Sequence, residues 1–224
     1  MGTRIPAPAR RKLTREVRRE QIIDATLAEL ALRGYARVTL ADIARRAGMS
    51  QALVNFHFAT KDRLLADTLL FLDAEYRENW QRACAEAEPH AAAQIEALIR
   101  ADFREPIYTR ERLAAWCAFW GETRSRPLYQ EICGANHDLY NLNLQNLCAS
   151  LLAGGGYPGD PGRVARAIRT LVEGIWLDIL TMRSPYGVDE ALGTVYTCLA
   201  AFFPAHFSAT GRIPLRVPAK RSRQ

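Results

Sequence analysis

Three short segments that each follow a hydroxyl residue constrain the fold of this chain most. Thr39 precedes LADIARRAG, Ser50 precedes QALVNFHF, and Thr60 precedes KDRLLADTLL. A hydroxyl at such a position accepts a hydrogen bond from a free amide at a helix start. Asp42, three residues after Thr39, completes a variant of the capping box, and Gly48 supplies a helix stop. The pattern predicts two short helices joined by a tight turn and then a longer helix.

Two short helices joined through a glycine are typical of a helix-turn-helix, whose second helix enters a major groove about 12 Å wide. Small side chains would let the two helices approach closely, and the core of the unit is predicted to consist of Ile43, Ala44, Ala47, Met49, Leu53 or Val54, and Phe58. A plain helical hairpin is the alternative that this stretch alone leaves open.

Apolar residues recur at helical spacing through most of the remaining chain. Residues 14–33 form one such segment, which Gly34 ends. After Pro89 the spacing predicts helices at 90–104, 110–124, 127–152, 161–182 and 188–203. Glycines 154–156 are interpreted as a flexible loop. No strand-like alternation of useful length is present, so we expect an all-α fold with a three-helix helix-turn-helix head and a body of roughly six helices.

Charge divides the chain into a basic start, an acidic middle and a basic end. Residues 1–66 carry 13 basic and 6 acidic side chains, residues 67–211 carry 12 and 18, and residues 212–224 carry 5 and none. A basic head is suited to a polyanion, because each Lys or Arg placed on a phosphate releases counterions. An acidic body would stay off the duplex. The charge distribution therefore favours double-stranded DNA as the partner of the head.

The run TLADIARRAGMSQALVNFHFATKDRLL resembles the signature of the TetR family of bacterial transcriptional regulators. The matching features are a Thr before a short helix, DIA, AGxS, an aromatic pair ending in Phe58, Lys61, and the Leu64-Leu65 pair. The preceding helix, with Gly34 and Tyr35, extends the resemblance over residues 18–65. The resemblance implies nine helices, a homodimer, and repression that a small molecule relieves.

With that resemblance, the chain is predicted to have four parts. They are a flexible basic arm at 1–13, a DNA-binding domain at 14–65, a ligand-binding and dimerisation domain at 66–207, and a basic tail at 208–224. The two basic ends would either lie along DNA or serve as solvated tails.

The resemblance also implies which residues bind DNA: Thr39, Ser50, Gln51, Ala52, Asn55, His57 and Lys61. Residues 50–55 would face the groove, where Gln51 and Asn55 offer a paired donor and acceptor to base edges. Asn55 replaces a tyrosine common in the family. A dimer would bind two half-sites spaced by whole helical turns, roughly 34 Å or a multiple.

Phosphate contacts are implied for Thr39, His57 and Lys61. Two of these residues lie at helix starts, where free amides favour anions. His57 would otherwise be a core histidine. Arg45 and Arg46 would add charge to the face or remain solvated.

The helices predicted at 161–182 and 188–203 would pair with their mates in a dimer, as the resemblance implies. Their apolar residues are Val164, Ile168, Leu171, Val172, Ile175, Ile179, Leu192, Val195, Leu199 and Phe202. These stripes are broad enough for a core and an interface. Alternatively, they only close each monomer.

The segment AAWCAFWGE places Trp116 and Trp120 on one helical face, with Phe119 adjacent. Such aromatic stripes are often core. Tryptophans near carboxylates are also what a quaternary ammonium ion needs, because cation-π attraction replaces its lost hydration. The nearby candidates for such carboxylates are Glu122, Glu173 and Asp178.

The body resembles the choline-responsive branch of the family, which represses glycine betaine synthesis. The resemblance rests on AWxAFW, Leu128-Tyr129, and EGIWLD around Trp176. It implies that choline or a related cation binds among Trp116, Phe119, Trp120 and Trp176 and reduces operator affinity. Another ligand, such as a drug or an acyl compound, is the alternative.

Other function classes are weakly supported. The chain has no P-loop, HExxH or dinucleotide glycine pattern, so we expect neither an enzyme nor a cofactor. Cys133 and His137 would supply only two metal ligands, so a metal or redox sensor is a lesser alternative, and no metal is expected. A helical interaction protein that has lost DNA binding is another. Five widely spaced cysteines without a secretory leader or membrane span predict a cytoplasmic protein.

Overall fold

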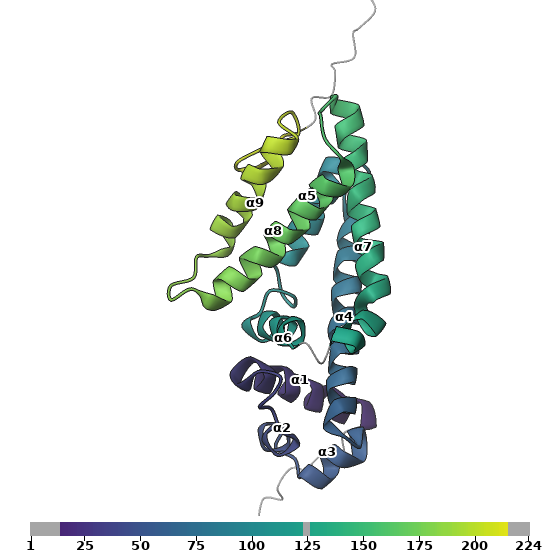
Figure 1. Ribbon diagram of the computed structural model, residues 1–224, viewed down its shortest axis with the longest axis vertical. Helices are drawn as coiled ribbons and strands as arrows, with labels where there is room; N and C mark the ends of the chain where they lie inside the picture. The colour runs from purple at the N-terminus through teal and green to yellow at the C-terminus, as the bar shows by residue number, and fades with distance from the viewer. Residues whose placement is uncertain (1–13, 123–125, 215–224) are drawn as a thin grey trace, which may run out of the picture.

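The computed structural model describes residues 14–122 and 126–214, which form nine helices and one short hairpin (Figure 1). The helices are α1 Arg15–Arg33, α2 Leu40–Arg46, α3 Gln51–Phe58, α4 Lys61–Glu86, α5 Ala91–Asp102, α6 Arg110–Gly121, α7 Arg126–Gly155, α8 Pro161–Thr181 and α9 Val188–Phe202. The strands are β1 Phe207–Ser208 and β2 Gly211–Arg212. The predicted all-α fold is confirmed. We call α1–α3 the head and α4–α9 the body.

The hydroxyl caps of the head form as the sequence predicts. Thr39 Oγ1 accepts from the Asp42 amide at 3.2 Å, and Ser50 Oγ accepts from the Leu53 amide at 3.2 Å. Thr60 caps α4 in the same way. Gly48 adopts a φ of +64° in the turn between α2 and α3, a conformation that L side chains rarely adopt. The turn therefore sets the angle at which α3 leaves α2.

The core of the head matches the predicted set closely. Ile43, Ala44, Val54 and Phe58 are each at most 3% exposed. Val54, rather than Leu53, is the buried residue of that pair, because Leu53 lies one position round the helix and is half-buried.

Two clusters of ion pairs hold α1 against α2 and against α4. Glu29 of α1 is buried and accepts from Arg33 at 2.5 Å and from Arg46 of α2 at 2.6 Å. Burial raises the pKa of Glu29, but the hydrogen bonds from Arg33 and Arg46 outweigh it, so the net pKa is lowered. Arg19 of α1 donates to Asp67 of α4 at 2.5 Å and lies 4.4 Å over the Phe58 ring. Ion pairs with buried carboxylates and partly exposed arginines therefore hold the head together and join it to α4.

The body is built on two long helices, α4 and α7, which lie side by side, with α8 and α9 along one flank (Figure 1). The predicted domain boundary between residues 65 and 66 falls inside α4, which is one unbroken helix from Lys61 to Glu86. α6 lies between α1 of the head and α8, and it contacts both.

The interpretation of glycines 154–156 as a flexible loop is wrong, because α7 continues to Gly155. The chain then turns back so tightly that a Cβ at Gly155 would lie 2.2 Å from the Tyr157 ring. The Tyr157 hydroxyl in turn contacts His206 Nδ1 at 3.1 Å. Gly155 thus allows the Tyr157 ring to pack closely against the end of α7.

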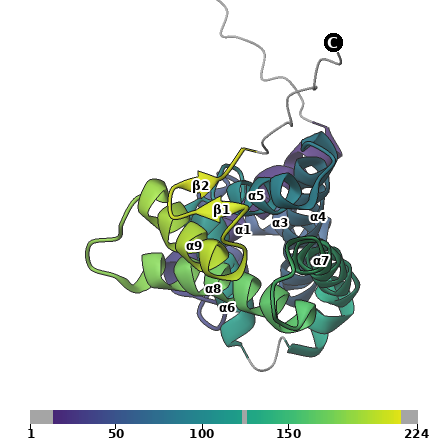
Figure 2. The same ribbon diagram turned by 90° about the horizontal axis from the view of Figure 1, so that it is seen from above.

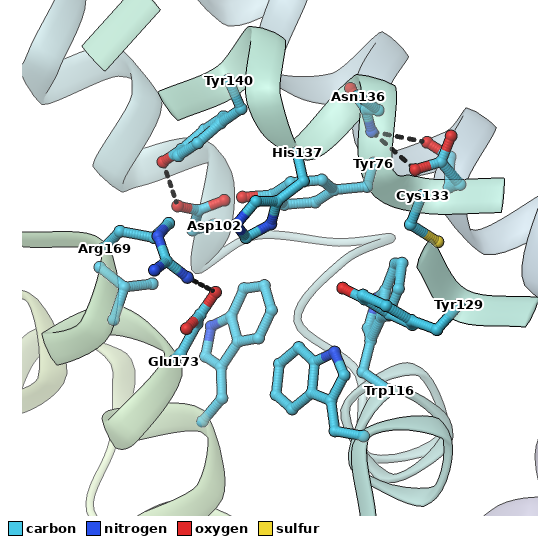
Figure 3. Close-up of a pocket in the computed structure, with 14 residues that line it drawn as sticks. Tyr76, Asp102, Trp116, Tyr129, Cys133, Asn136, His137, Tyr140, Arg169 and Glu173 are labelled. Carbon is cyan, nitrogen blue, oxygen red and sulfur yellow. Dashed lines mark hydrogen bonds and ion pairs between the residues drawn. The ribbon is translucent and has the colours of Figure 1, made fainter. Parts of the chain in front are cut away.

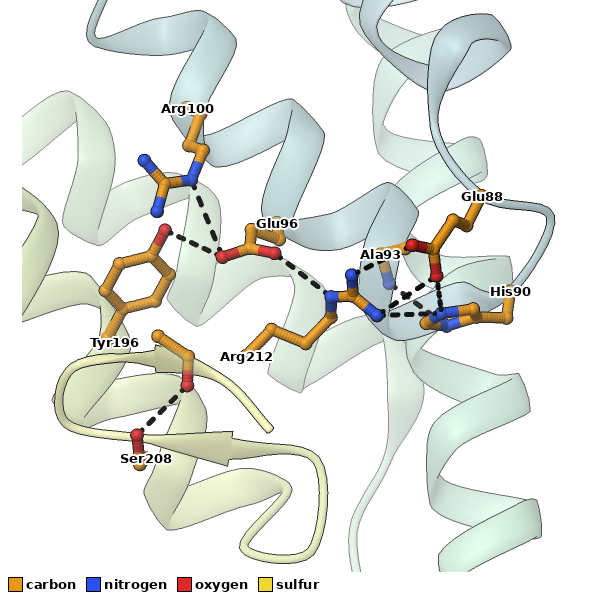
Figure 4. A network of polar contacts seen from close by, with 9 residues as sticks. Glu88, His90, Ala93, Glu96, Arg100, Tyr196, Ser208 and Arg212 are labelled. Carbon is orange, nitrogen blue, oxygen red and sulfur yellow. Dashed lines mark hydrogen bonds and ion pairs between the residues drawn. The ribbon is translucent and has the colours of Figure 1, made fainter. Parts of the chain in front are cut away.

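The predicted basic tail begins inside an ordered element, because residues 207–212 form a hairpin against α5 and α9 (Figures 2 and 4). Phe207 is 1% exposed, and Arg212 donates to Glu96 at 3.1 Å and to Glu88 at 3.2 Å. The ordered body therefore continues past residue 208. Residues 215–224 and the predicted arm at 1–13 lie outside the described residues.

The apolar stripes of α8 and α9 are used mainly inside the subunit. Seven of the ten predicted residues are buried there: Val164, Ile168, Val172, Ile175, Leu192, Val195 and Leu199. Exposed residues of α8 and α9 include small side chains, Leu177 and several charged groups. The small ones and Leu177 are Ala167, Thr170, Gly174, Leu177, Thr194, Thr197 and Ala201, and the charged ones are Arg163, Arg166, Asp178, Asp189 and Glu190.

Candidate functional site

The first candidate site is the exposed face of α3. Gln51, Ala52 and Asn55 are all exposed, and the spacing of four residues between Gln51 and Asn55 places them on one side of the helix. Phe56, which was not among the predicted DNA-binding residues, joins this face and is 71% exposed. The structure therefore brings the predicted base-reading residues together and adds an aromatic ring.

The other predicted DNA-binding residues lie around this face, and several already have hydrogen-bond partners. The Thr39 hydroxyl donates to Asp42 Oδ2 at 2.6 Å and the Ser50 hydroxyl caps α3, so both hydroxyls are already engaged. Lys61, the first residue of α4, donates from Nζ to the Tyr35 carbonyl at 3.2 Å. A phosphate at Lys61 would compete with that carbonyl.

His57 lies at the edge of the face, beneath the arginines of α1. Its backbone carbonyl accepts from Arg19 at 3.1 Å, while its Nδ1 is buried without a hydrogen-bond partner. Burial lowers the pKa of His57, and the nearby charges of Arg15, Arg19 and Arg18 lower it further. The ring is therefore neutral at neutral pH and would offer a phosphate a hydrogen bond but no charge.

Arg15 and Arg18 were missed as candidates for the DNA face. They lie in the first turns of α1, close enough to His57 to affect its pKa. Their charge was visible in the sequence, but nothing there placed the start of α1 beside the end of α3. Cations beside the exposed face of α3 are chemically suited to contacts with phosphates.

The second candidate site is a cavity in the body, with an empty volume of about 540 Å³ including its open mouth (Figure 3). Helices α4, α5, α6, α7 and α8 all contribute to its wall. The lining residues are Asp73, Tyr76, Asp102, Trp116, Trp120, Tyr129, Cys133, Asn136, His137, Tyr140, Arg169, Val172, Glu173 and Trp176.

Four rings form a closed cycle in this wall, which we call the aromatic cage: Tyr76, Trp116, Trp120 and Trp176. Neighbouring ring centroids are 6.2 Å apart for Tyr76 and Trp116, 6.1 Å for the two α6 tryptophans, 6.4 Å for Trp120 and Trp176, and 6.2 Å for Trp176 and Tyr76. Each ring lies within 6.4 Å of two others, so a cation against the face of one ring would also lie near its neighbours. Cation-π attraction acts within roughly 6 Å of a ring centroid.

Three carboxyl groups share the cavity with one arginine. Asp73 accepts from Asn136 Nδ2 at 2.8 Å, and Glu173 accepts from Arg169 at 2.7 Å. Asp102 is 1% exposed and accepts from the Tyr140 hydroxyl at 3.4 Å (Figure 3). Burial raises the pKa of Asp102 to about 7. Acidic groups outnumber the arginine, so the cavity favours a cation over an anion.

Three of the four predicted ligand residues line this cavity: Trp116, Trp120 and Trp176. Phe119 does not line this cavity, although it lines a neighbouring hollow that shares Trp120, Tyr129 and His137 with it. Its ring packs against Tyr35 of α1, with centroids 5.6 Å apart and planes at 74°. It therefore belongs to the junction between head and body, because it lies on the side of α6 that faces α1.

Of the three carboxylates considered beside the tryptophans, only Glu173 lines the cavity. Asp178 instead accepts from the Tyr186 hydroxyl at 3.1 Å. Tyr76 and Asp102 were missed, because helical periodicity shows that a residue faces inward but not which other helix it meets.

Cys133 and His137 also line the cavity, but residues 14–122 and 126–214 contain no group of three or more side chains placed to hold a metal ion. Burial raises the pKa of the Cys133 thiol and lowers the pKa of His137. In the described part of the chain, no helix has the length and apolar character needed to cross a membrane.

Family models match both parts of the chain. Residues 22–68 match the model described as bacterial regulatory proteins of the tetR family, and residues 89–204 match the BetI-type transcriptional repressor C-terminal model. A relative named HTH-type transcriptional regulator BetI from Paraburkholderia xenovorans is 32% identical over 187 residues, covering 80% of this chain and 90% of the relative. A BetI from Agrobacterium fabrum is 30% identical and covers 78% and 82%.

Solved structures share the fold. A putative transcriptional regulator from Pseudomonas aeruginosa superposes with a TM-score of 0.72 at 24% identity, covering 86% of this chain and 93% of that one. A putative regulator from Saccharomonospora viridis, solved in complex with choline, has a TM-score of 0.64 at 21% identity, with 80% and 94% covered. Because the BetI-type model alone spans more than half of the chain and the relatives agree, this chain belongs to the TetR family as a transcriptional repressor, not an enzyme, with a BetI-type C-terminal domain.

Proposed function

We propose that this repressor is released from its operator by choline or a related quaternary ammonium ion. It acts in the cytoplasm as a homodimer, and its targets are genes of choline uptake and glycine betaine synthesis. The cation enters the cavity between α4, α6, α7 and α8 and lies within the aromatic cage.

The aromatic cage beside three carboxyl groups carries this proposal. A quaternary ammonium ion has no hydrogen to donate, so polar partners cannot replace its hydration, whereas the faces of aromatic rings can. Tyr76, Trp116, Trp120 and Trp176 provide four such rings. Asp102 and Glu173 add negative charge without needing a hydrogen bond from the ligand. An anionic acyl ligand would meet repulsion from the same groups.

The relatives support the same ligand class. The curated relatives carry the BetI name, and one structural neighbour was solved with choline bound. The chemistry of the cage points to that class independently of these names.

At the other end of the protein, we assign base reading to Gln51, Ala52 and Asn55 on the exposed face of α3. The start of α2 at Thr39 and the start of α3 at Ser50 would hold phosphates through their free amides.

Lys61 would form an ion pair with a third phosphate, and His57 would contact the backbone as a neutral donor. Release of Lys61 from the Tyr35 carbonyl is then part of binding DNA.

The test is a titration of the full-length protein bound to its operator with choline and with 3,3-dimethyl-1-butanol. The alcohol has the shape of choline but no charge. We expect choline to quench Trp fluorescence and release the operator, and the neutral isostere to do neither at the same concentration. Equal responses to both compounds, or no response to any quaternary ammonium ion, would contradict the proposal.

A matched pair of variants tests the cage itself. Trp120→Leu removes a π face, and we expect it to weaken choline binding by about tenfold or more, since a desolvated cation-π contact is worth roughly 2 kcal/mol. Trp120→Phe keeps an aromatic face and should lose far less. Operator binding without ligand should be unchanged in both, because Trp120 is remote from α3. Similar losses in the two variants would show that the ring only fills space.

A further inference from the structure

Phe56 is the most exposed large apolar side chain in the described part of the protein, with 71% of it accessible. Phe58, two residues further along α3, is 2% exposed and lies in the core under Arg19. The same helix therefore buries one phenylalanine and presents the other. Apolar surface left in water is unfavourable, so Phe56 gains from any apolar group that covers it.

The outward position of Phe56 is supported by its neighbour. The rings of Phe56 and His57 meet edge to face, with centroids 5.4 Å apart and planes at 85°. His57 is held in turn by Arg19, which donates to its carbonyl at 3.1 Å. The phenyl ring thus has a supported side against His57 and a free side.

The free side belongs to the face that would enter the groove. Phe56 follows Asn55 directly and lies one helical turn after Ala52, and all three are exposed. A phenyl ring cannot hydrogen-bond to a phosphate. The cations that suit phosphates lie elsewhere, at Arg15 and Arg18 in the first turns of α1.

The major groove offers such a ring one apolar partner. Its base edges present hydrogen-bond donors, acceptors and the C5-methyl group of thymine. Residues 1–66, which include the head, carry 13 basic and 6 acidic side chains, a charge complementary to the phosphates around the groove. A thymine in double-stranded DNA meets both conditions, because its methyl group covers the apolar ring and the neighbouring phosphates pair with the basic side chains.

We propose that Phe56 is a specificity-determining residue that reads a thymine in each operator half-site by covering its C5-methyl group. This inference rests on the proposed function, since it requires α3 to enter the major groove. Gln51 and Asn55 then read hydrogen-bonding edges, while Phe56 reads the methyl, so the face distinguishes thymine from cytosine by shape as well as by hydrogen bonds.

The experiment uses a duplex that the wild-type protein selects from a random pool. Each thymine is replaced in turn, symmetrically in both half-sites, by deoxyuridine, which lacks the methyl and keeps every hydrogen-bonding group. At one position we expect wild-type affinity to fall about threefold to fivefold per half-site, the value of burying one methyl-sized group. Phe56→Ala should bind more weakly and bind the thymine and uracil duplexes equally.

Gln51→Ala is the matched control, because it alters the same exposed face but should keep the thymine preference. The inference is overturned if wild-type affinity is indifferent to uracil at every position. It is also overturned if Phe56→Ala still binds the thymine duplex more tightly than the uracil duplex. A Gln51→Ala protein that binds the two duplexes equally would likewise overturn it, because the thymine preference would then depend on Gln51. Failure of the wild-type protein to select any duplex at low salt would instead overturn DNA binding itself, and the choline titration tests the ligand proposal separately.

Discussion

The protonation state of one carboxyl group, Asp102, affects the charge of the cavity. It is 1% exposed, it lies beside two tyrosine hydroxyls, and its Oδ1 has no hydrogen-bond partner. Burial raises its pKa from an ordinary value of 3.8 to about 7. The hydrogen bonds from Tyr76 and Tyr140 oppose that rise but do not cancel it. Near neutral pH, the group is therefore balanced between its two protonation states.

The raised pKa predicts how Asp102→Asn changes stability with pH. The folded wild-type protein holds a proton that the unfolded chain releases above pH 3.8, so wild-type stability is lost as pH rises from about 4 to about 7. The amide has no such dependence. We expect the free energy of unfolding of Asp102→Asn, relative to wild type, to increase over this window by about 1.4 kcal/mol per unit of pKa shift.

The measurement is urea unfolding of both proteins at pH 4.5, 6 and 8, followed by circular dichroism. The difference should grow up to about pH 7 and then level off. A difference that is constant across this range would show that Asp102 is ionised throughout and that the cavity stays negative in the absence of ligand.

At the residue scale, the sequence predicts interactions between residues that are close together in the chain. The caps at Thr39, Ser50 and Thr60 formed because a cap involves residues only three positions apart. Tyr76 and Asp102 joined the cavity through contacts between α4, α5 and α7, and no local pattern specifies such contacts.

The helix α6 connects the two candidate sites. Trp116 and Trp120 point to the cavity, while Phe119 packs against Tyr35 of α1. The Tyr35 carbonyl is the group that holds Lys61. A movement of α6 caused by a ligand would therefore reach Lys61, which we assign to phosphate binding, through one ring contact and one hydrogen bond.

This arrangement predicts that Phe119→Leu weakens the coupling between ligand and DNA. We expect choline affinity within about twofold of wild type, since Phe119 does not line the cavity, and a choline-induced loss of operator affinity reduced about fivefold or more, as couplings of 1–3 kcal/mol allow. Calorimetry measures the first quantity, and operator anisotropy with and without saturating choline measures the second. Unchanged operator release would exclude this route.

At the element scale, most helices could be predicted, but their faces could not. Predicted ranges such as 161–182 and 188–203 differ by a residue or so from α8 and α9. Phe119 and Trp120 are adjacent, and periodicity alone did not reveal that they face different neighbours. The hairpin at residues 207–212 was also missed, since strands of two residues carry no alternation to detect.

At the scale of the whole molecule, the exposed face of α8 and α9 is where we expect the second subunit. Small side chains such as Ala167, Thr170 and Gly174 let helices of two subunits approach closely. Leu177, 51% exposed, lies on the same helix. The buried stripes that periodicity selected for this role serve the subunit's own core instead.

Leu177→Glu should separate the subunits, because it places a charge within an apolar contact. We expect the mass in solution to fall from about twice 25.1 kDa to 25.1 kDa and operator affinity to fall about a hundredfold or more, since one head then binds alone. Light scattering and anisotropy give the two values. Leu142→Glu, at a comparably exposed position on α7, is the matched control. A Leu177→Glu protein that stays dimeric would place the interface elsewhere.

The ion pairs that fasten the head have a consequence for gene control. Because Glu29 and Arg19 lock α1 to α2 and to α4, we expect an inducer to alter the distance between two rigid heads and leave α3 unchanged. A displaced pair of heads stays bound only if the DNA between the half-sites bends or twists to follow, and that elastic cost depends on its sequence. Promoters with stiff spacers would then switch on at lower doses of inducer than promoters with pliable ones.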